Sequence, residues 1–337
     1  MVQGAEYVNG QYTYRYKQQG YYSSDSTLKW SNILNDGWGV QLTDKDDVNP
    51  VISSLCTYIN DKPIVSMSYM FYKSQAKTLD VTGFDTGNVT DMSYMFPSSQ
   101  STTLDVSNFD TRKVTDMSYM FSQSKATILD VSNFDTSNVT NMNSMFRSTQ
   151  IKNIDLSNFD TSNVTNMGYM FYASKMTTLD VSNFDTSNVT DMIWMFGKTN
   201  AVNLNLSNFD TSNVTDMYAM FSGSKALMID VSNFNTSKVT NMADMFSETN
   251  VKVLDLSSFD TGNVTTMNFM FRSCYKLKTV YVSNKFKTGK VTNHADMFLG
   301  TSLVGGNGTR WSYDHRDKTY ARIDTEATPG YFTLKTN

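Results

Sequence analysis

The sequence predicts a repeat protein of the α/β class, in which short parallel strands and short helical segments wind into one right-handed solenoid. The segment LDVSNFDTSNVT at residues 129–140 recurs unchanged at 179–190. Near-copies follow at a strict spacing of 25 residues, beginning at Leu79, Leu104, Ile154, Leu204, Ile229 and Leu254. The dipeptide Met-Phe recurs ten times, from residues 70–71 to 297–298. A fixed period of this kind is typical of proteins built by stacking one small unit.

The first full unit shows why strands are expected. In TLDVT, Leu79 and Val81 alternate with polar residues, which predicts a short strand with both side chains inward. With Phe84 in the usual Asn position, the spacing fits an α/β repeat solenoid of leucine-rich-repeat type. The following FDTGN is rich in turn formers. Each unit is therefore expected to run from strand to turn.

The second half of the unit predicts a short helix. Val89, Met92 and Phe96 follow the spacing of one helical face, and Met and aromatic residues are abundant enough to build the core. Thr86 and Thr90 recur in every full unit. Short hydroxyl side chains at fixed corners are expected to bond the backbone of a neighbouring unit.

The two ends do not repeat and are expected to cap the array of residues 64–298. Residues 1–63 form a Tyr- and Trp-rich arm and cap, with a hairpin at Asn9-Gly10 and with Trp30 and Trp38 covering the first repeat. Residues 299–337, rich in Gly and ending in aromatics, form the C-terminal cap.

Composition and charge exclude several classes of protein. The net charge of −4 gives no reason to expect nucleic acid as a partner. No apolar window approaches the roughly 18 residues of a membrane span, and we expect no membrane insertion and no signal peptide or anchor in this chain. Cys56 and Cys274 flank the repeats, roughly 40 Å apart at one strand spacing of ~4.8 Å per repeat, so two free thiols are expected.

Catalytic signals are weak, and we expect no enzyme activity and no cofactor. The two histidines are His294, in a column that otherwise holds Met, and His315 in the tail. GGNG at residues 305–308 lacks the context of a phosphate-binding loop, and none of the common hydrolase, zinc or redox motifs occurs. His294 is expected to be a substitution tolerated in the core.

An acidic column lies on the outward strand position. It consists of Asp80, Asp105, Asp130, Asp155, Asp180, Asp230 and Asp255, with Asn205 and Tyr281 at two further repeats. Carboxylates ~4.8 Å apart repel one another, so something must offset the repulsion. One interpretation is hydrogen bonding to flanking residues such as Ser107 and Ser132. The other is a stripe that binds cations or sugars, although a flat ladder offers too few oxygens for a tight calcium site, and no metal is expected.

An aromatic column lies between the two Met positions of each repeat. It holds Tyr69, Tyr94, Tyr119, Tyr169, Trp194 and Phe269, with Ser144, Ala219 and Asp244 in the other copies. On a helical wheel this position points away from the core. Variable, outward aromatics are typical of a contact surface. The alternative is that the rings stack on each other and shield the short helices.

The unit LDVSNFDTSNVTDMSYMF resembles the 25-residue repeat of BspA-like bacterial surface proteins, also found in mycoplasma lipoproteins, across about residues 64–298. The resemblance implies a non-catalytic, surface-exposed binding or adhesion protein, extracellular or on the cell surface, whose partner is a host-cell or bacterial protein or glycan. An alternative on the same repeat is a bacteriophage virion surface protein, in decoration or receptor binding, docked on phage structural proteins through residues 1–30.

Overall fold

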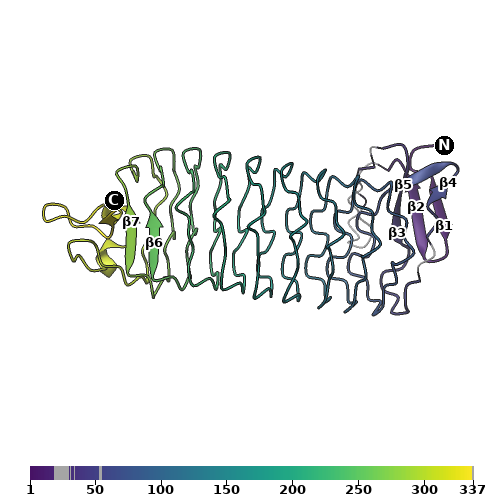
Figure 1. The fold of residues 1–337 in the computed structure, drawn as a ribbon, viewed down its shortest axis with the longest axis horizontal. Helices are drawn as coiled ribbons and strands as arrows, with labels where there is room; N and C mark the ends of the chain where they lie inside the picture. The colour runs from purple at the N-terminus through teal and green to yellow at the C-terminus, as the bar shows by residue number, and fades with distance from the viewer. Residues whose placement is uncertain (19–29, 31, 34, 53–54, 336–337) are drawn as a thin grey trace. The chain divides into compact units, whose positions relative to one another are not determined.

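The structure, a computed structural model, describes residues 1–18, 30, 32–33, 35–52 and 55–335 (Figure 1). The chain divides into two compact units, which are described separately: unit 1 comprises Met1–Asn163 with Ser174–Met176, and unit 2 comprises Val164–Ala173 with Thr177–Asn337. In both units the repeats run as successive coils.

Each of the two compact units contains one small sheet. The sheet of unit 1 is mixed, in the order β1-β2-β3-β5-β4, and consists of β1 (Glu6–Asn9), β2 (Tyr12–Tyr16), β3 (Trp38–Leu42), β4 (Tyr58–Ile59) and β5 (Lys62–Ser66). The sheet of unit 2 is parallel, in the order β6-β7-β8, and consists of β6 (Val253–Leu256), β7 (Thr279–Val282) and β8 (Thr333–Leu334). Two short 3₁₀ turns, η1 (Tyr313–His315) and η2 (Lys318–Tyr320), lie in the tail.

The prediction of an α/β leucine-rich-repeat solenoid with helical segments is wrong. The described residues form a nearly all-β protein, and the only helical turns among them are η1 and η2. The expected strand at the LDV position forms as a strand at β6 and at its neighbour β7. In other described repeats it is at most a single parallel bridge, such as the one between Thr103 and Ile128.

The segment expected to be helical instead carries the backbone bonds between repeats. Alternate N–H groups donate to carbonyls of the next repeat: Met67 to Asp91 at 2.9 Å, Tyr69 to Ser93 at 3.1 Å and Phe71 to Met95 at 2.7 Å. The N–H groups between them turn back three residues, as from Met70 to Met67 at 3.2 Å. The backbone N–H groups of this segment are thus hydrogen-bonded either within a local turn or to the next repeat, because buried backbone polar groups need partners.

Backbone angles explain why the sequence pattern was misleading. Tyr69 and Lys73 both have φ of 59°, and equivalent residues in later repeats also lie in the left-handed region. A right-handed helix requires negative φ throughout. Overlapping four-residue turns, such as those closed from Met70 to Met67 and from Tyr72 to Tyr69, bury side chains at spacings that a helix also produces. Met92, Met95 and Phe96 are therefore fully buried although no helix forms.

Stacked phenylalanines and threonine bonds join successive repeats. In unit 1, Phe96 and Phe121 lie 5.6 Å apart between ring centroids and within 3° of parallel. In unit 2, the rings of Phe221 and Phe246 lie 5.7 Å apart. The Thr86 hydroxyl donates to the carbonyl of Asp110 at 3.0 Å and accepts from its N–H at 2.7 Å. The expected hydroxyl bonds between repeats are therefore confirmed.

The N-terminal sheet supplies the donors that a preceding repeat would provide. The hairpin at Asn9-Gly10 is confirmed by the pairing of β1 with β2. Gln41 Nε2 donates to the carbonyl of Ser68 at 3.0 Å, and the Leu42 N–H donates to that of Met70 at 3.2 Å. Lys45, only 7 % exposed, donates through Nζ to the carbonyl of Tyr69 at 2.8 Å.

The predicted tryptophans both lie in this cap. Trp38 is 2 % exposed on β3 and pairs with Ile64. Trp30 clusters with Ile33 and Val65. Within the predicted arm and cap of residues 1–63, residues 19–29, 31, 34 and 53–54 lie outside the described residues.

The tail covers the last repeat of unit 2. The Phe298 N–H donates to the carbonyl of Arg316 at 2.9 Å, and the Phe298 ring meets those of Tyr331 and Phe332 edge-on. Cys56 and Cys274 are free thiols, as predicted. No helix in the described part of the chain is long and apolar enough to cross a membrane.

Candidate binding surfaces

The aromatic column of unit 1 forms a stack of tyrosine rings. Tyr69 and Tyr94 lie 4.5 Å apart and within 7° of parallel, and Tyr94 and Tyr119 lie 4.3 Å apart and within 9°. All three side chains are half-buried. Burial, together with the neighbouring phenols, raises the pKa of Tyr94. Because the ring faces cover one another, ring edges and hydroxyls are what this column offers to a partner.

The aromatic column of unit 2 is organised differently. Tyr169 and Trp194 are nearly parallel at 6.4 Å, while Tyr172 and Tyr218 meet Trp194 edge-on at 5.1 and 5.8 Å. Ala219, which follows Trp194 in the column, is fully buried. The last predicted member, Phe269, lies under the guanidinium of Arg272 at 4.7 Å. The structure therefore brings five of the six predicted residues into two clusters and leaves Phe269 apart from them.

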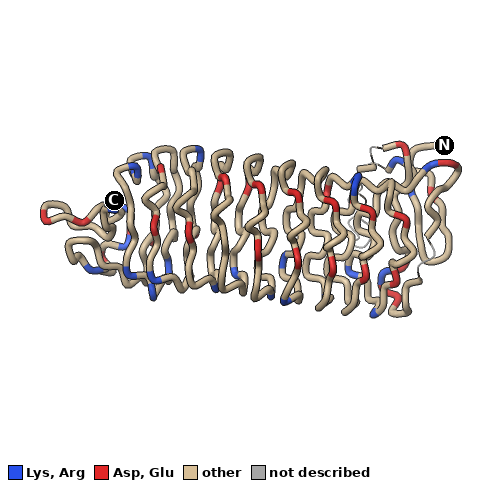
Figure 2. Tube along the Cα trace, viewed as in Figure 1, with Lys and Arg blue, Asp and Glu red and all other residues tan. Residues whose placement is uncertain are grey.

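The acidic column bonds first to its own repeats. An oxygen of Asp105 accepts from the Ser107 hydroxyl at 2.6 Å and from its N–H at 3.1 Å, and these bonds lower the pKa of Asp105 although the charge of Asp130 opposes them. The same bond from the residue two positions later occurs at Asp80, Asp130, Asp155, Asp180, Asp230 and Asp255. Local hydrogen bonds therefore offset the repulsion, while binding by the column stays a prediction. Acidic residues recur at the same place in successive coils (Figure 2).

Asp255 differs from the rest of the column because it also has a cationic partner. Burial raises its pKa, but the Lys335 ammonium at 2.9 Å and the bonds from Ser257 lower it by more. Lys335 also lies over the ring of Tyr281, 5.0 Å from its centroid. This end of the column is thus neutralised within unit 2.

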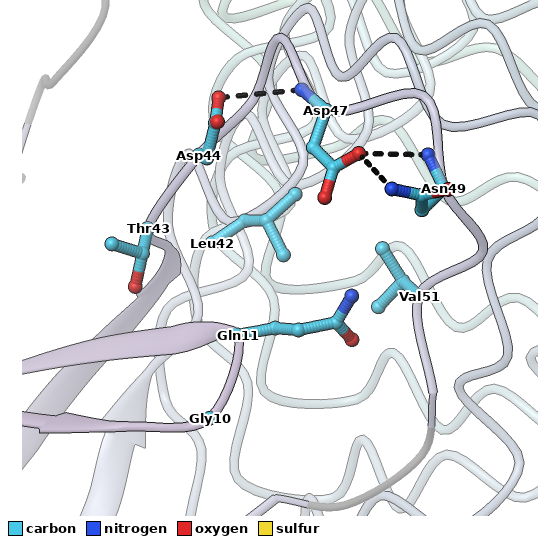
Figure 3. A pocket seen from close by; sticks show the side chains of 8 residues that line it. All are labelled: Gly10, Gln11, Leu42, Thr43, Asp44, Asp47, Asn49 and Val51. Atoms are coloured by element: carbon cyan, nitrogen blue, oxygen red, sulfur yellow. Dashed lines mark hydrogen bonds between the residues drawn. The ribbon is translucent and has the colours of Figure 1, made fainter.

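Two hollows of unit 1 were not predicted. A pocket of about 220 Å³ has the apolar floor Leu42 and Val51 beneath Asp44 and Asp47 (Figure 3). Both carboxylates there accept nearby N–H groups. A polar groove of about 480 Å³ lies between the cap and the first repeats; its polar lining includes Asn32, Asn35, Thr90, Asp91, Thr115 and Asp116. These linings combine residues far apart in the sequence, so no local motif could reveal them.

An apolar groove in unit 2 was also missed. It encloses about 610 Å³ and is lined by Leu227, Met228, Ile229, Asp230, Asn250, Lys252, Val253, Asp255 and Lys276. The signal was present in the sequence: Leu227 and Met228 occupy the two positions that hold Thr and Ile at 127–128 and Thr-Thr at 177–178. An exposed pair of large apolar side chains replaces smaller or polar ones there.

Asparagines form further bonds between repeats that sequence reasoning missed. Asn133 Nδ2 donates to the carbonyl of Ser107, and Asn138 Nδ2 donates to that of Arg112, both at 2.8 Å. Equivalent bonds occur in unit 2 from Asn213 and Asn263. The two asparagines in every SNFDTSNVT segment were the signal available in the sequence. Their side chains bond the preceding repeat rather than their own turn.

The histidines do not converge on a site. His294 is half-buried, and its Nδ1 is enclosed with no hydrogen-bond partner among the described residues. His315 stacks on Tyr320 at 4.1 Å. Across the described part of the chain, no three or more His, Cys, Asp or Glu side chains gather as a metal site would require.

Fold and surfaces together define a β-rich repeat protein whose 25-residue units are joined by backbone, threonine and asparagine bonds. Residues 65–178, 98–208, 148–254 and 190–311 each match the family described as Mycoplasma protein of unknown function, DUF285. Together the matches cover most of the chain, and the chain belongs to this family. No curated protein and no solved structure matches it.

Proposed function

We propose that this chain is a non-catalytic binding protein, displayed at a surface, that holds a protein or glycan through the outward aromatic residues of its repeats. The observation that carries the proposal is the half-exposed stack of Tyr69, Tyr94 and Tyr119. Each of these residues has φ between 54° and 59°, where glycine is sterically easier than tyrosine. Tyrosine therefore occupies a backbone position that glycine would adopt at lower steric cost.

Two further arguments support this function. Rings at one position of several repeats give several weak contacts, and several weak contacts produce avidity without a deep pocket. The repeat also resembles that of BspA-like bacterial surface proteins, which implies display outside the cell and adhesion. The partner class is accordingly a repetitive protein or glycan surface.

The test uses immobilised mucin and intact bacterial cells as probes. Replacing Tyr94, Tyr119, Tyr169 and Trp194 by Ser should abolish binding of the folded protein. The melting temperature should fall modestly, since stacked pairs contribute about 0.5–1.5 kcal/mol each. A matched variant with Phe at the same four positions keeps the rings and should retain stability. Unchanged binding by the Ser variant would assign the rings to stability alone, and a wild-type chain that binds neither probe would contradict adhesion.

A further inference from the structure

The apolar groove of unit 2 is exposed rather than part of the core. Leu227, Met228 and Val253 are 64 %, 77 % and 50 % exposed. Leu227 donates its N–H to the carbonyl of Val202 at 3.1 Å, so Val202, 41 % exposed, extends the same patch. Single exposed apolar side chains are ordinary, but contiguous ones mark sites of interaction.

The groove lies along an extended strand and is larger than the two hollows of unit 1. Its volume of about 610 Å³ exceeds that of the polar groove, about 480 Å³, and of the Figure 3 pocket, about 220 Å³. One wall is β6, which pairs with β7 along one edge. Toward the preceding repeat, the described residues show no backbone hydrogen bond between segments 228–231 and 253–256. Extended walls present side chains with a period of two, which matches an extended peptide.

Two lysines and two aspartates line the groove, in a chain whose net charge is −4. Lys252 and Lys276 line it, and neither forms an ion pair with any described residue. Of the two acidic lining residues, Asp255 is paired with Lys335, and Asp230 has no ion pair among the described residues. The two lysines thus outnumber the one remaining carboxylate, and the lining carries a net positive charge. The unpaired ammonium groups favour a partner with carboxylates.

We propose that this groove binds an extended segment of a partner protein in which apolar side chains alternate with Asp or Glu. The apolar side chains lie against Leu227, Met228 and Val253, and the carboxylates meet Lys252 and Lys276. The site shares no residue with the aromatic column. An experiment on the groove can therefore fail or succeed independently of the function proposed above for the aromatic column.

The experiment measures fluorescence anisotropy of a labelled eight-residue peptide that alternates leucine with glutamate. The full chain should bind it more tightly than peptides that alternate leucine with lysine or serine with glutamate. Met228→Ser should weaken binding at least about tenfold, since the lost contact is central to the patch. Lys252→Ala with Lys276→Ala should weaken binding and flatten its dependence on salt.

A matched control occupies the same column in unit 1. Ile128 is the counterpart of Met228 and is 74 % exposed, so Ile128→Ser should leave peptide binding unchanged. Both substitutions are at exposed positions and should shift stability by no more than about 0.5 kcal/mol. Equal binding of the serine–glutamate peptide, or unchanged binding by Met228→Ser, would overturn the proposal. So would absence of binding by the wild type. Concentration-dependent dimers in light scattering that Met228→Ser removes would assign the groove to a second copy instead.

Discussion

Two segments of each repeat run past their counterparts in the next repeat, and they are held in different ways. The segment from Met67 to Ser74 donates alternate backbone N–H groups across to the following repeat. The segment from Leu79 to Val81 makes one bridge, to Val51, and its counterparts in most described repeats make none. The first segment is therefore a backbone-bonded face. The second is a side-chain-held face, because the turn that follows it is bonded to the next repeat through Thr and Asn side chains, as from Asn108 to the Thr82 carbonyl.

The backbone-bonded face contributes most to stability, whereas the other face carries the residues that vary between repeats. On the bonded face, Phe71, Phe96 and Phe121 stack with no exposed area, which leaves little freedom to change. On the other face, residues beside the inward Leu and Val point to solvent and vary, from Thr103 to Ile128 to Met228. Such variation costs little stability and can carry recognition.

The largest expected effect comes from breaking the bonded face. Phe121→Ala removes a ring with no exposed area between Phe96 and Phe146 and should cost about 3–5 kcal/mol, with a large fall in the melting temperature. Ile128→Ala on the other face should cost less than about 0.5 kcal/mol. Urea unfolding followed by circular dichroism measures both. Similar losses from the two substitutions would contradict the division between the faces.

A smaller effect, dependent on pH, is expected where the bonded face ends at the N-terminal sheet. Burial lowers the pKa of Lys45 to about 7, and its Nζ bonds Gln41 and Tyr69. Between pH 7 and the unfolded pKa of roughly 10.4, the unfolded chain holds a proton that the native chain lacks. The free energy of unfolding should therefore rise with pH, by at most about 1.4 kcal/mol per unit.

The measurement is a series of urea melts from pH 7 to 8. This window stays below the range in which Cys274, Tyr14 and other groups with a raised pKa would oppose the trend: burial raises the pKa of Cys274 to about 11 and that of Tyr14 to about 12. Lys45→Met should remove the rise. A wild-type stability that is flat over this window, or a Met variant with the same slope, would show that Lys45 is charged in the folded protein.

Part of this fold could be predicted from the sequence. The period, the buried Leu, Val, Met and Phe, the hairpin at Asn9-Gly10 and the threonine bonds all follow from residue type and spacing. The absence of a helix could not be predicted, because overlapping four-residue turns bury Met92 and Phe96, and the preceding turn buries Val89, at the spacing of a helix. The sequence pattern could not show the positive φ of Tyr94, since its steric cost is offset by tertiary contacts.

Some candidate sites could be predicted from the sequence and others could not. Columns that recur at one position, such as Asp105 and Asp130 or Tyr94 and Tyr119, are visible in an aligned repeat. The groove at Met228 depends on Lys276, which lies outside the repeated pattern, and on the missing backbone bonds beside β6. Such a site requires the packing of successive coils to be known.

The smallest expected effect concerns the acidic column on the side-chain-held face. Asp130 and Asp155 each accept an N–H from the residue two positions on, at 2.9 Å, and these local bonds occupy oxygens that a cation would need. Millimolar calcium should leave the melting temperature unchanged. The bonds from Ser157 lower the pKa of Asp155, and the charge of Asp130 opposes them. Asp130→Asn with Asp155→Asn should be neutral or slightly stabilising, because an amide oxygen can accept the same bonds, as Asn205 does from Ser207, while the repulsion is removed. Differential scanning calorimetry with and without calcium measures both. A calcium-dependent rise that the double variant abolishes would instead make this face a cation-binding stripe, through linkage of binding to folding.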